Sequence, residues 1–489
     1  MSDASPDRGG RARDKGPWAD RVRFDRVSGD APFAYRPHEV LTTGGNEALT
    51  VANELYPEAE VRGEVGRFLH LERVPEPVEL VQELQMRGHV AHPNHVFFAH
   101  DACGCCPPHP SSPCGEAGSP MYGSPMYGHA AMSGAPMYGH AAISGAPMYG
   151  HAAMEGTPMY GHAALYGSPM YGSPMYGSPM YGHPMYGHPM YGHAPVKSTA
   201  QPAPAGVPTH EITVDVREVA VSGAPTVIIL DTGLAESEYR PAALDGTTPI
   251  RAASDTDVDA PDENDDDTLD PAAGHGTFIA GVVGQVAPGC GVTIHRVLTT
   301  FGDGDEVGIV QCLDSLEIDD EQAPKTILNL SFGGYVLDHP FALARAVRHL
   351  QARGVVVVAS AGNDATCQPT YPAALPGVVG VGAIGPGGPA PFTNYGPWVR
   401  ACAPGVDILS CFFNGFNGKA QPDADGVDAD RFQGWALWSG TSFSTPVVVG
   451  ALARVMREQN CTARQAVARV VDAPALMRIP NLGTVVNVI

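Results

Sequence analysis

The sequence predicts an α/β fold in which helices cover both faces of a doubly wound, mainly parallel sheet. In the second half of the chain, short β-branched apolar runs alternate with longer segments of helical spacing. This alternation is typical of parallel sheets, because each crossover helix covers one face. The first run also ends in a carboxylate, Asp231, at the strand end where such sheets usually place their sites. The expected strands are 226–230, 291–298, 326–332, 354–361 and 377–384, and the expected helices are 276–286, 307–318, 340–352 and 443–458.

The first hundred residues divide into two segments of different composition. Residues 1–30 are polar and rich in Arg, Asp and Gly, which predicts a disordered N-terminus. Residues 31–100 predict a small α/β domain. We expect a strand at 67–71, a helix at 77–86 that begins at a proline, and an extended segment at 90–98.

Residues 101–205 predict a low-complexity linker without a packed core. Pro-Met-Tyr-Gly occurs ten times between Pro120 and Gly192, with a period that shortens from eleven residues to five. Proline at this spacing excludes a helix, and glycine favours turns. The tract could be an expanded spacer or a tyrosine-rich segment for self-association.

A cysteine cluster precedes the repeats and contains Cys103, Cys105, Cys106 and Cys114, with His109 nearby. It lacks the paired two-residue spacing of a zinc finger. Disulfides or a reducible thiol cluster are therefore preferred to a metal site. The other six cysteines, expected as buried thiols, are Cys290, Cys312, Cys367, Cys402, Cys411 and Cys461, of which 402 and 411 could pair if oxidised.

Three short motifs follow one another in the remaining segment, residues 206–489. Asp231 begins Asp-Thr-Gly, His275 begins His-Gly-Thr, and Ser442 ends Gly-Thr-Ser before an expected helix. An acid, a base and a hydroxyl are the parts of a nucleophilic hydrolase. Each also has a plain structural reading, because Asp231 and Ser442 could cap a turn or a helix and His275 could be a core histidine.

With these motifs, the segment from about 222 to 489 resembles the subtilisin-like serine proteases (subtilases), whose triad follows the same order. Residues 359–363 resemble the family segment that bears the oxyanion asparagine, and residues 328–334 resemble the strand that lines the substrate cleft. The resemblance implies a serine endopeptidase. Its catalytic residues would be Asp231, His275, Ser442 and the oxyanion donor Asn363, and its substrate-binding residues Ser331, Phe332, Gly333 and Gly362. Asn363 could otherwise be a turn residue.

Two further resemblances concern the front of the chain. The pattern of 31–100 is similar to the inhibitory propeptide of many subtilases, although it could be an unrelated docking domain. Met-Tyr-Gly resembles the X-Tyr-Gly sites of peptides that tyramine-excising radical S-adenosylmethionine enzymes modify. A second function class therefore stays open, in which the chain is a precursor or scaffold whose repeats are the product and whose protease domain matures it or is held inhibited.

Between the first two motifs lies an acidic stretch, 255–270, with nine Asp or Glu residues. The family resemblance makes calcium a candidate ligand there, but the stretch lacks the glycine and terminal glutamate of an EF-hand loop. We expect a solvated surface loop that could favour basic substrates. The proposed chemistry requires no cofactor.

Composition limits the partners and the compartment. The formal charge of −23 argues against nucleic acid or an anionic membrane. No apolar stretch reaches the ~18 residues of a membrane helix, and the first 27 residues lack an apolar signal core. We expect cytoplasmic residence or a non-classical export route. The expected partners are a polypeptide substrate, an intramolecular propeptide and a peptide-modifying enzyme acting on the repeats.

Overall fold

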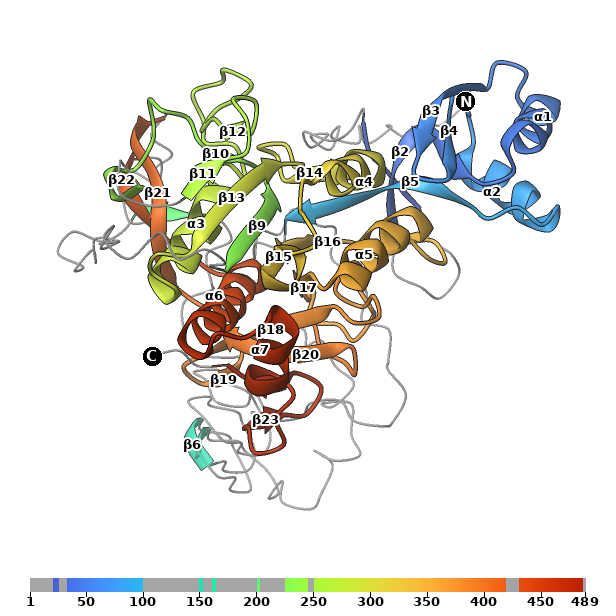
Figure 1. Ribbon diagram of the computed structural model, residues 1–489. Helices are drawn as coiled ribbons and strands as arrows, with labels where there is room; N and C mark the ends of the chain where they lie inside the picture. The colour runs from blue at the N-terminus through green and yellow to red at the C-terminus, as the bar shows by residue number, and fades with distance from the viewer. Residues whose placement is uncertain are drawn as a thin grey trace, which may run out of the picture.

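The structure of the protein is a computed structural model that describes residues 21–25, 33–99, 149–152, 161–163, 200–202, 225–244, 250–418 and 431–486. Figure 1 shows a small N-terminal domain, drawn in blue, beside a larger unit coloured green to red. The cysteine cluster and most of the repeats lie outside the described residues.

A 10-stranded sheet lies at the centre of the larger unit. Its strands follow the order β11-β13-β9-β15-β17-β18-β20-β24-β23, and every pair from β11 to β24 is parallel. The predicted fold class, a mainly parallel α/β sheet preceded by a small domain, is confirmed. The strands are β9(Thr226–Asp231), β11(Ile250–Ala252), β13(Gly291–Arg296), β15(Thr326–Leu330), β17(Val356–Ser360), β18(Val379–Gly385), β19(Gly388–Pro389), β20(Val399–Pro404), β23(Arg478–Ile479) and β24(Gly483–Val485).

Helices cover both faces of this sheet, and the strand residues alternate between two cores. On β9, Val227 and Ile229 join the core formed with α3, α6 and α7, whereas Ile228 and Leu230 join the core formed with α4 and α5. Each predicted helix is present with ends shifted by at most three residues. The helices are α3(His275–Val286), α4(Glu306–Ser315), α5(Phe341–Arg353), α6(Thr441–Gln459) and α7(Ala463–Val470), with short 3-10 turns η3(Ala242–Leu244) and η4(Ala323–Lys325).

Three small sheets complete the strand pairing. β10(Leu234–Ala235) and β12(Val258–Asp259) pair in parallel beside the end of β9. β21(Ile408–Asn417), β22(Arg431–Trp438) and β8(Gln201–Pro202) form an antiparallel sheet, and Ala200 is buried in the core. Residues 200–202, which lie within the predicted linker 101–205, therefore attach to the larger unit. Within the repeats, β6(Tyr149–Ala152) and β7(Gly161–Ala163) pair in parallel.

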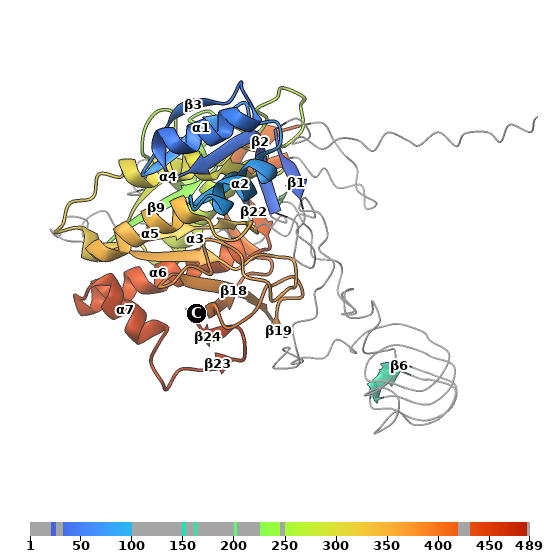
Figure 2. The same cartoon turned by 90° about the vertical axis from the view of Figure 1, so that its right-hand side faces the viewer.

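The N-terminal domain packs two helices on an antiparallel sheet. Its elements are β2(Phe33–Thr42), α1(Gly45–Leu55), β3(Glu60–Val65), β4(Phe68–Glu72), α2(Pro77–Met86) and β5(Ala91–Ala99). Helices α1 and α2 lie on the side away from the larger unit and face the viewer in Figure 2. The predicted helix and the two predicted strands are present, whereas β2, α1 and β3 were not predicted.

One prediction for the N-terminus is wrong in part, because β1(Arg23–Asp25) pairs with β2 although it lies in the segment expected to be disordered. Val22 packs with Ala34, Val96 and Phe98, and the Phe24 ring stacks on Phe98 with ring centroids 6.1 Å apart. The polar composition of residues 1–30 does not indicate that Val22 and Phe24 pack on the N-terminal domain.

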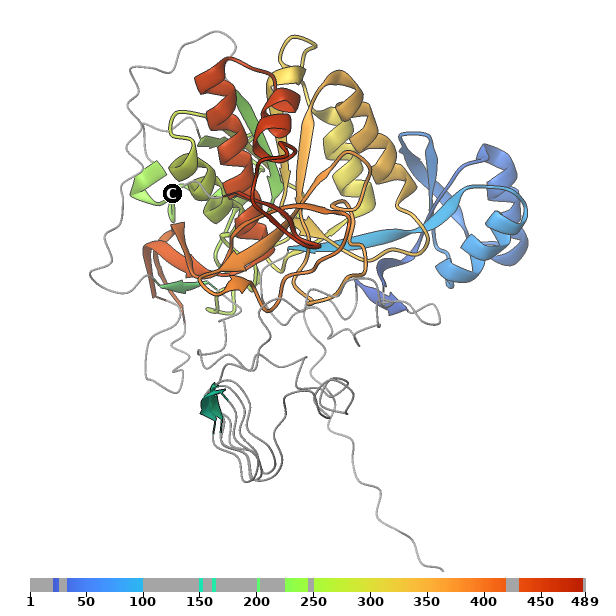
Figure 3. The same cartoon turned by 90° about the horizontal axis from the view of Figure 1, so that it is seen from below.

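The strand β5 connects the two bodies. It pairs with β2 of its own domain and, antiparallel, with β14(Asp303–Asp305) and β16(Phe332–Gly333) of the larger unit. Figure 3 shows β5 in light blue, running from the N-terminal domain into the larger unit.

The described cysteines correct one expectation. Cys290, Cys402 and Cys411 are buried free thiols as expected, whereas Cys312 and Cys461 are free but only partly buried, and Cys367 is disulfide-bonded. The expectation rested on the missing signal core and on spacing, and neither shows which cysteines meet in space. Separately, none of the helices in the described ranges is long and apolar enough to cross a bilayer.

Candidate active site

The predicted acid and base are in contact. Asp231 ends β9 and His275 begins α3, and the two side chains are fully buried. His275 Nδ1 lies 2.6 Å from Asp231 Oδ1, which also accepts a hydrogen bond of 2.9 Å from the Thr232 backbone N–H. The carboxylate thus fixes the proton on Nδ1 and leaves Nε2 as the basic nitrogen of the ring.

Two glycines permit this approach of helix to strand. A Cβ on Gly276 would lie 2.3 Å from the carbonyl oxygen of Gly233, so α3 can pack on the loop after β9 only without a side chain there. Gly233 itself has a positive φ of 111°, a conformation that favours glycine. The glycines of Asp-Thr-Gly and His-Gly-Thr therefore allow the side chains of Asp231 and His275 to meet.

The predicted nucleophile, Ser442, lies in the first turn of α6 and is fully buried. Its Oγ donates a hydrogen bond of 2.8 Å to the carbonyl oxygen of Ser331, and Ser331 Oγ donates one of 2.8 Å to the carbonyl of Ser442. The next residue, Phe443, packs against the His275 ring with centroids 5.3 Å apart.

Asn363 follows β17 and points its side chain at the start of α6. Its Oδ1 accepts hydrogen bonds from the Thr441 N–H at 3.0 Å and the Thr441 hydroxyl at 2.9 Å. This arrangement fixes the amide plane beside Ser442, with the donor Nδ2 at the opposite end from Oδ1. Gly362, predicted to bind substrate, uses its N–H and carbonyl within the protein, with Thr441 and Asn394, and has a positive φ of 104°.

A carboxylate that the motifs did not reveal connects the loops of the acid and the base. Asp259 on β12 is fully buried, and its Oδ2 accepts hydrogen bonds from Thr232 Oγ1 at 2.6 Å and the Gly274 N–H at 2.8 Å. Thr232 Oγ1 in turn accepts the Gly276 N–H at 3.0 Å. Burial raises the pKa of Asp259 well above its ordinary value, although both hydrogen bonds oppose the shift. Its only sequence signal was membership of an acidic stretch.

The substrate-binding residues predicted from 328–334 lie along β5. Phe332 pairs with Ala99 and Gly333 with Phe98, while β14 pairs on the other side of the same strand. The Ala99 N–H also donates to the carbonyl of Gly302 at 2.8 Å. The strand β5 therefore occupies the space between β14 and β16. Its last residue, Ala99, pairs with Phe332, the residue that follows Ser331.

Two groups of side chains within the described ranges have the composition of a metal site. One contains His92, His95 and Glu306, all buried, and the other contains Glu39, His70 and Glu72. In the first, His95 Nδ1 lies 2.9 Å from Glu306 Oε2, and Nε2 accepts the Leu337 N–H at 3.2 Å. Because Nε2 is an acceptor here, Nδ1 carries the proton and is unsuited to bind a metal. This group is a hydrogen-bonded contact between β5 and α4.

The acidic stretch is largely folded on itself. Asp262 accepts hydrogen bonds from the backbone of Asp266 and Asp267, and Asp270 accepts the Thr300 hydroxyl at 2.6 Å. Glu263 forms an ion pair of 2.7 Å with Arg296. Neither of the two candidate metal groups in the described ranges includes a residue of 255–270.

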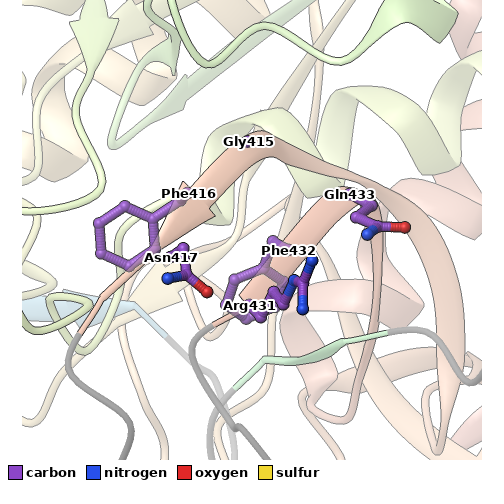
Figure 4. Close-up of a pocket in the computed structure, with 6 residues that line it drawn as sticks. All are labelled: Gly415, Phe416, Asn417, Arg431, Phe432 and Gln433. Carbon is purple, nitrogen blue, oxygen red and sulfur yellow. The ribbon is translucent and has the colours of Figure 1, made fainter.

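A hollow of about 380 Å³ lies away from these residues, at the end of the β21–β22 hairpin. Its lining, shown in Figure 4, consists of Gly415, Phe416, Asn417, Arg431, Phe432 and Gln433. Its lining includes none of the predicted site residues.

Comparisons with known proteins agree with this geometry. The sequence model of the subtilase family matches residues 222–475, which is more than half of the chain. Subtilisin-like protease 3 of Pseudogymnoascus destructans is 31% identical over 245 residues, covering 48% of this chain and 52% of the relative. Thermophilic serine proteinase of Bacillus sp. strain AK1 is 30% identical over 264 residues, covering 51% and 57%.

The chain thus spans about half the length of the curated relatives it matches. Among solved structures, a cold adapted subtilisin-like serine proteinase is similar with a TM-score of 0.40 and 25% identity, over 54% of this chain and 88% of that one.

Proposed function

This chain belongs to the subtilase family, and on that premise we propose that it is a serine endopeptidase that cleaves peptide bonds. The observation that carries the proposal is the buried pair of His275 Nδ1 and Asp231 Oδ1, 2.6 Å apart, with the His275 ring packed against Phe443, the residue after Ser442. Ser442 Oγ attacks the scissile carbonyl while His275 Nε2 takes its proton, and Asp231 stabilises the imidazolium. His275 then gives this proton to the leaving amine as the C–N bond breaks, and a water molecule, deprotonated by His275, hydrolyses the acyl-enzyme and restores Ser442. Asn363 Nδ2 and the Ser442 N–H stabilise the oxyanion.

The nucleophile is tested by Ser442→Ala. The variant should retain the fold and lose both peptide hydrolysis and labelling by a fluorophosphonate. In a related serine protease, loss of the nucleophile lowers kcat by roughly 10⁶. An active Ser442→Ala protein, purified from a host without other serine proteases, would reject the assignment.

We also propose that the N-terminal domain is an intramolecular inhibitor. Three features support it: β5 lies between β14 and β16 as a peptide substrate would, the strand is buried along its whole length, and Asp231, His275 and Ser442 have no exposed surface. On this proposal the described form is a closed one, in which Ser442, without exposed surface, meets a peptide from solution only after the N-terminal domain has moved.

Self-cleavage is then expected just after β5. Continuing the register beyond the pair of Ala99 and Phe332 directs the following peptide bonds of the strand to Ser331, whose carbonyl holds the Ser442 hydroxyl. Mass spectrometry of the purified protein should find a new N-terminus within about three residues after Ala99. The Ser442→Ala chain should remain intact, and cleavage in that variant would show that another protease makes the cut.

The proposed reaction uses only side chains and backbone groups of the chain, without a cofactor. Calcium would act on stability alone. Hydrolysis that stops on adding a chelator and returns with calcium, at unchanged folded fraction, would contradict this part of the proposal.

A further inference from the structure

Two aspartates on the edge strand β14 lie opposite alternate residues of β5. Asp303 pairs with Phe98 and Asp305 with Val96 in the antiparallel register. Directly opposite residues of such a pair share a face of the sheet, with Cβ atoms about 4.5–5.5 Å apart. A peptide that replaced β5 would therefore present its side chains at these two positions to the two carboxylates.

The larger unit fixes both carboxylates with its own groups. Asp303 Oδ1 accepts the Thr299 hydroxyl at 2.5 Å, and Asp303 is fully buried. Asp305 caps α4, because its Oδ1 accepts the Gly308 N–H at 3.0 Å. Groups of residues 299–308 therefore hold both carboxylates, in addition to the contacts that the N-terminal domain makes with them.

The carboxylates already bind two guanidinium groups from the N-terminal domain. Arg36 contacts both, with Nη1 3.0 Å from Asp303 Oδ2 and Nε 2.9 Å from Asp305 Oδ2. Arg21 Nη2 lies 2.9 Å from Asp303 Oδ1. The spacing of the two acids thus fits one planar guanidinium held by both.

Departure of the N-terminal domain removes all three contacts and leaves two fixed negative charges at the edge of the cleft. Such charges cost free energy unless a cation replaces the arginines, and the face opposite them is where the substrate side chains point. The same departure removes Val22 and Ala34, which cover Val96 and Phe98 in the closed form.

We propose that Asp303 and Asp305 form a specificity site that selects peptides with Arg, and less strongly Lys, at the positions of Phe98 and Val96 in β5. The inference rests on the proposed protease function and on release of the N-terminal domain. Arg is preferred to Lys at these positions because its planar guanidinium can contact both carboxylates at once.

The test compares two fluorogenic peptides with the sequence of residues 94–101, one with Arg and one with citrulline in place of Phe98. Citrulline has the same shape as Arg but no charge. The full-length chain after self-cleavage should show kcat/KM about tenfold higher for the Arg peptide, a difference of about 1.4 kcal/mol. The ratio should fall toward 1 as salt approaches 1 M.

Variants then locate the effect. Asp305→Asn and Asp303→Asn should each reduce the ratio of Arg to citrulline peptide severalfold, whereas Asp320→Asn, a fully exposed acid elsewhere on the surface, should leave it unchanged. If Asp303→Asn fails to fold, Asp305→Asn and the salt titration of the unaltered protein still show whether the carboxylates select Arg.

A ratio near 1 in an enzyme that hydrolyses both peptides would overturn the specificity site and leave the protease function standing. A preference for Arg that persists in both Asn variants would also overturn it, because the selecting charge would lie elsewhere. Failure to cleave either peptide, together with no fluorophosphonate labelling, would reject the protease function itself.

Discussion

Asp259 acts on the proposed triad without touching the substrate. Its Oδ2 holds Thr232, next to the acid, and Gly274, next to the base, so one oxygen sets the distance between the two loops. Because burial raises the pKa of Asp259 well above its ordinary value, the acceptor oxygen matters more here than a negative charge. Asn supplies such an oxygen and Ala does not.

We therefore expect Asp259→Ala to lower kcat by up to about 10², the effect of a small misplacement of catalytic groups, with little change in KM. Unsatisfied donors at Thr232 and Gly274 should also lower the free energy of unfolding by about 1–3 kcal/mol. Asp259→Asn should recover most of the lost kcat and most of the lost free energy of unfolding. Steady-state kinetics and urea unfolding measure the two effects, and equal kcat in the Ala variant would assign Asp259 to stability alone.

Asn363 has two roles that substitution can separate. Its Oδ1 holds Thr441, and its Nδ2 is the proposed oxyanion donor. Asn363→Ala should lower kcat by ~10²–10³, a range measured for the corresponding donor in subtilisin. Asn363→Asp keeps the acceptor for Thr441 but has no amide donor, so it should restore stability without restoring kcat. Full activity of the Asp variant would show that the amide does not stabilise the oxyanion.

For single residues, the sequence predicts those members of the candidate site that lie in short motifs. Asp231, His275, Ser442 and Asn363 each lie in a motif whose neighbours, such as Gly276, are required for local packing. Asp259 was not predicted, because its partners Thr232 and Gly274 are 27 and 15 residues away and adjoin it only after β12 pairs with β10. Nor could composition show that Asp303 and Asp305 face a strand more than 200 residues earlier.

Among the elements, β5 forms the main connection between the domains, and histidines dominate its contact with α4. Burial lowers the pKa of His95 to about 3 and lowers that of His92, while burial raises the pKa of Glu306 between them. His339, also with a pKa lowered by burial, and Asp338 face the same group. Burial therefore favours the neutral form of both β5 histidines in the docked state, whereas after release their pKa would return toward the ordinary value near 6.5.

The N-terminal domain should accordingly dock most strongly above pH 6.5. Its docking should weaken as pH falls from 6.5 toward 3, because the released domain binds more protons than the docked one. Because the pKa of His95 falls to about 3 in the docked form, His95 alone predicts about tenfold weaker inhibition at pH 5.5 than at pH 7.5, and His92 acts in the same direction. Glu306 opposes this trend only at pH values between its ordinary pKa, near 4.5, and its raised pKa in the docked form.

The measurement is the inhibition constant of the cleaved N-terminal domain at several pH values. His92→Gln and His95→Gln should each flatten the curve, whereas His349→Asn, an exposed position on α5, should not. An inhibition constant that does not change from pH 7.5 to 5.5 would contradict this account, because it would mean that the docked and released forms bind equal numbers of protons over that range.

Element boundaries show where periodicity is sufficient and where it is not. The helix at 77–86 was predicted residue for residue, because a proline starts it and its apolar spacing is regular. The strand β8 was missed, because two residues beside a repeat tract have no periodicity. Its pairing with β22 and the buried Ala200 place it in the larger unit only through tertiary contacts.

For the whole molecule, the arrangement of the domains gives the repeat tract two fixed ends. Before it, Ala99 pairs with Phe332 of the larger unit, and after it, Ala200 is buried beside β22. In the uncut chain the tract therefore closes a loop of residues 100–199 between two attached points. A self-cleaved chain would carry the tract attached only at its C-terminal end.

Deleting 119–193 tests this view of the chain. The deletion leaves 25 of the 100 residues between Ala99 and Ala200, and two halvings of loop length stabilise the closed form by about 1.2 kcal/mol. The Ser442→Ala chain, which stays uncut, should therefore unfold at a slightly higher temperature without the repeats. The self-cleaved chain should show no change, since its tract closes no loop. A lower unfolding temperature in either form would show instead that the repeats pack against the folded domains and contribute to their stability.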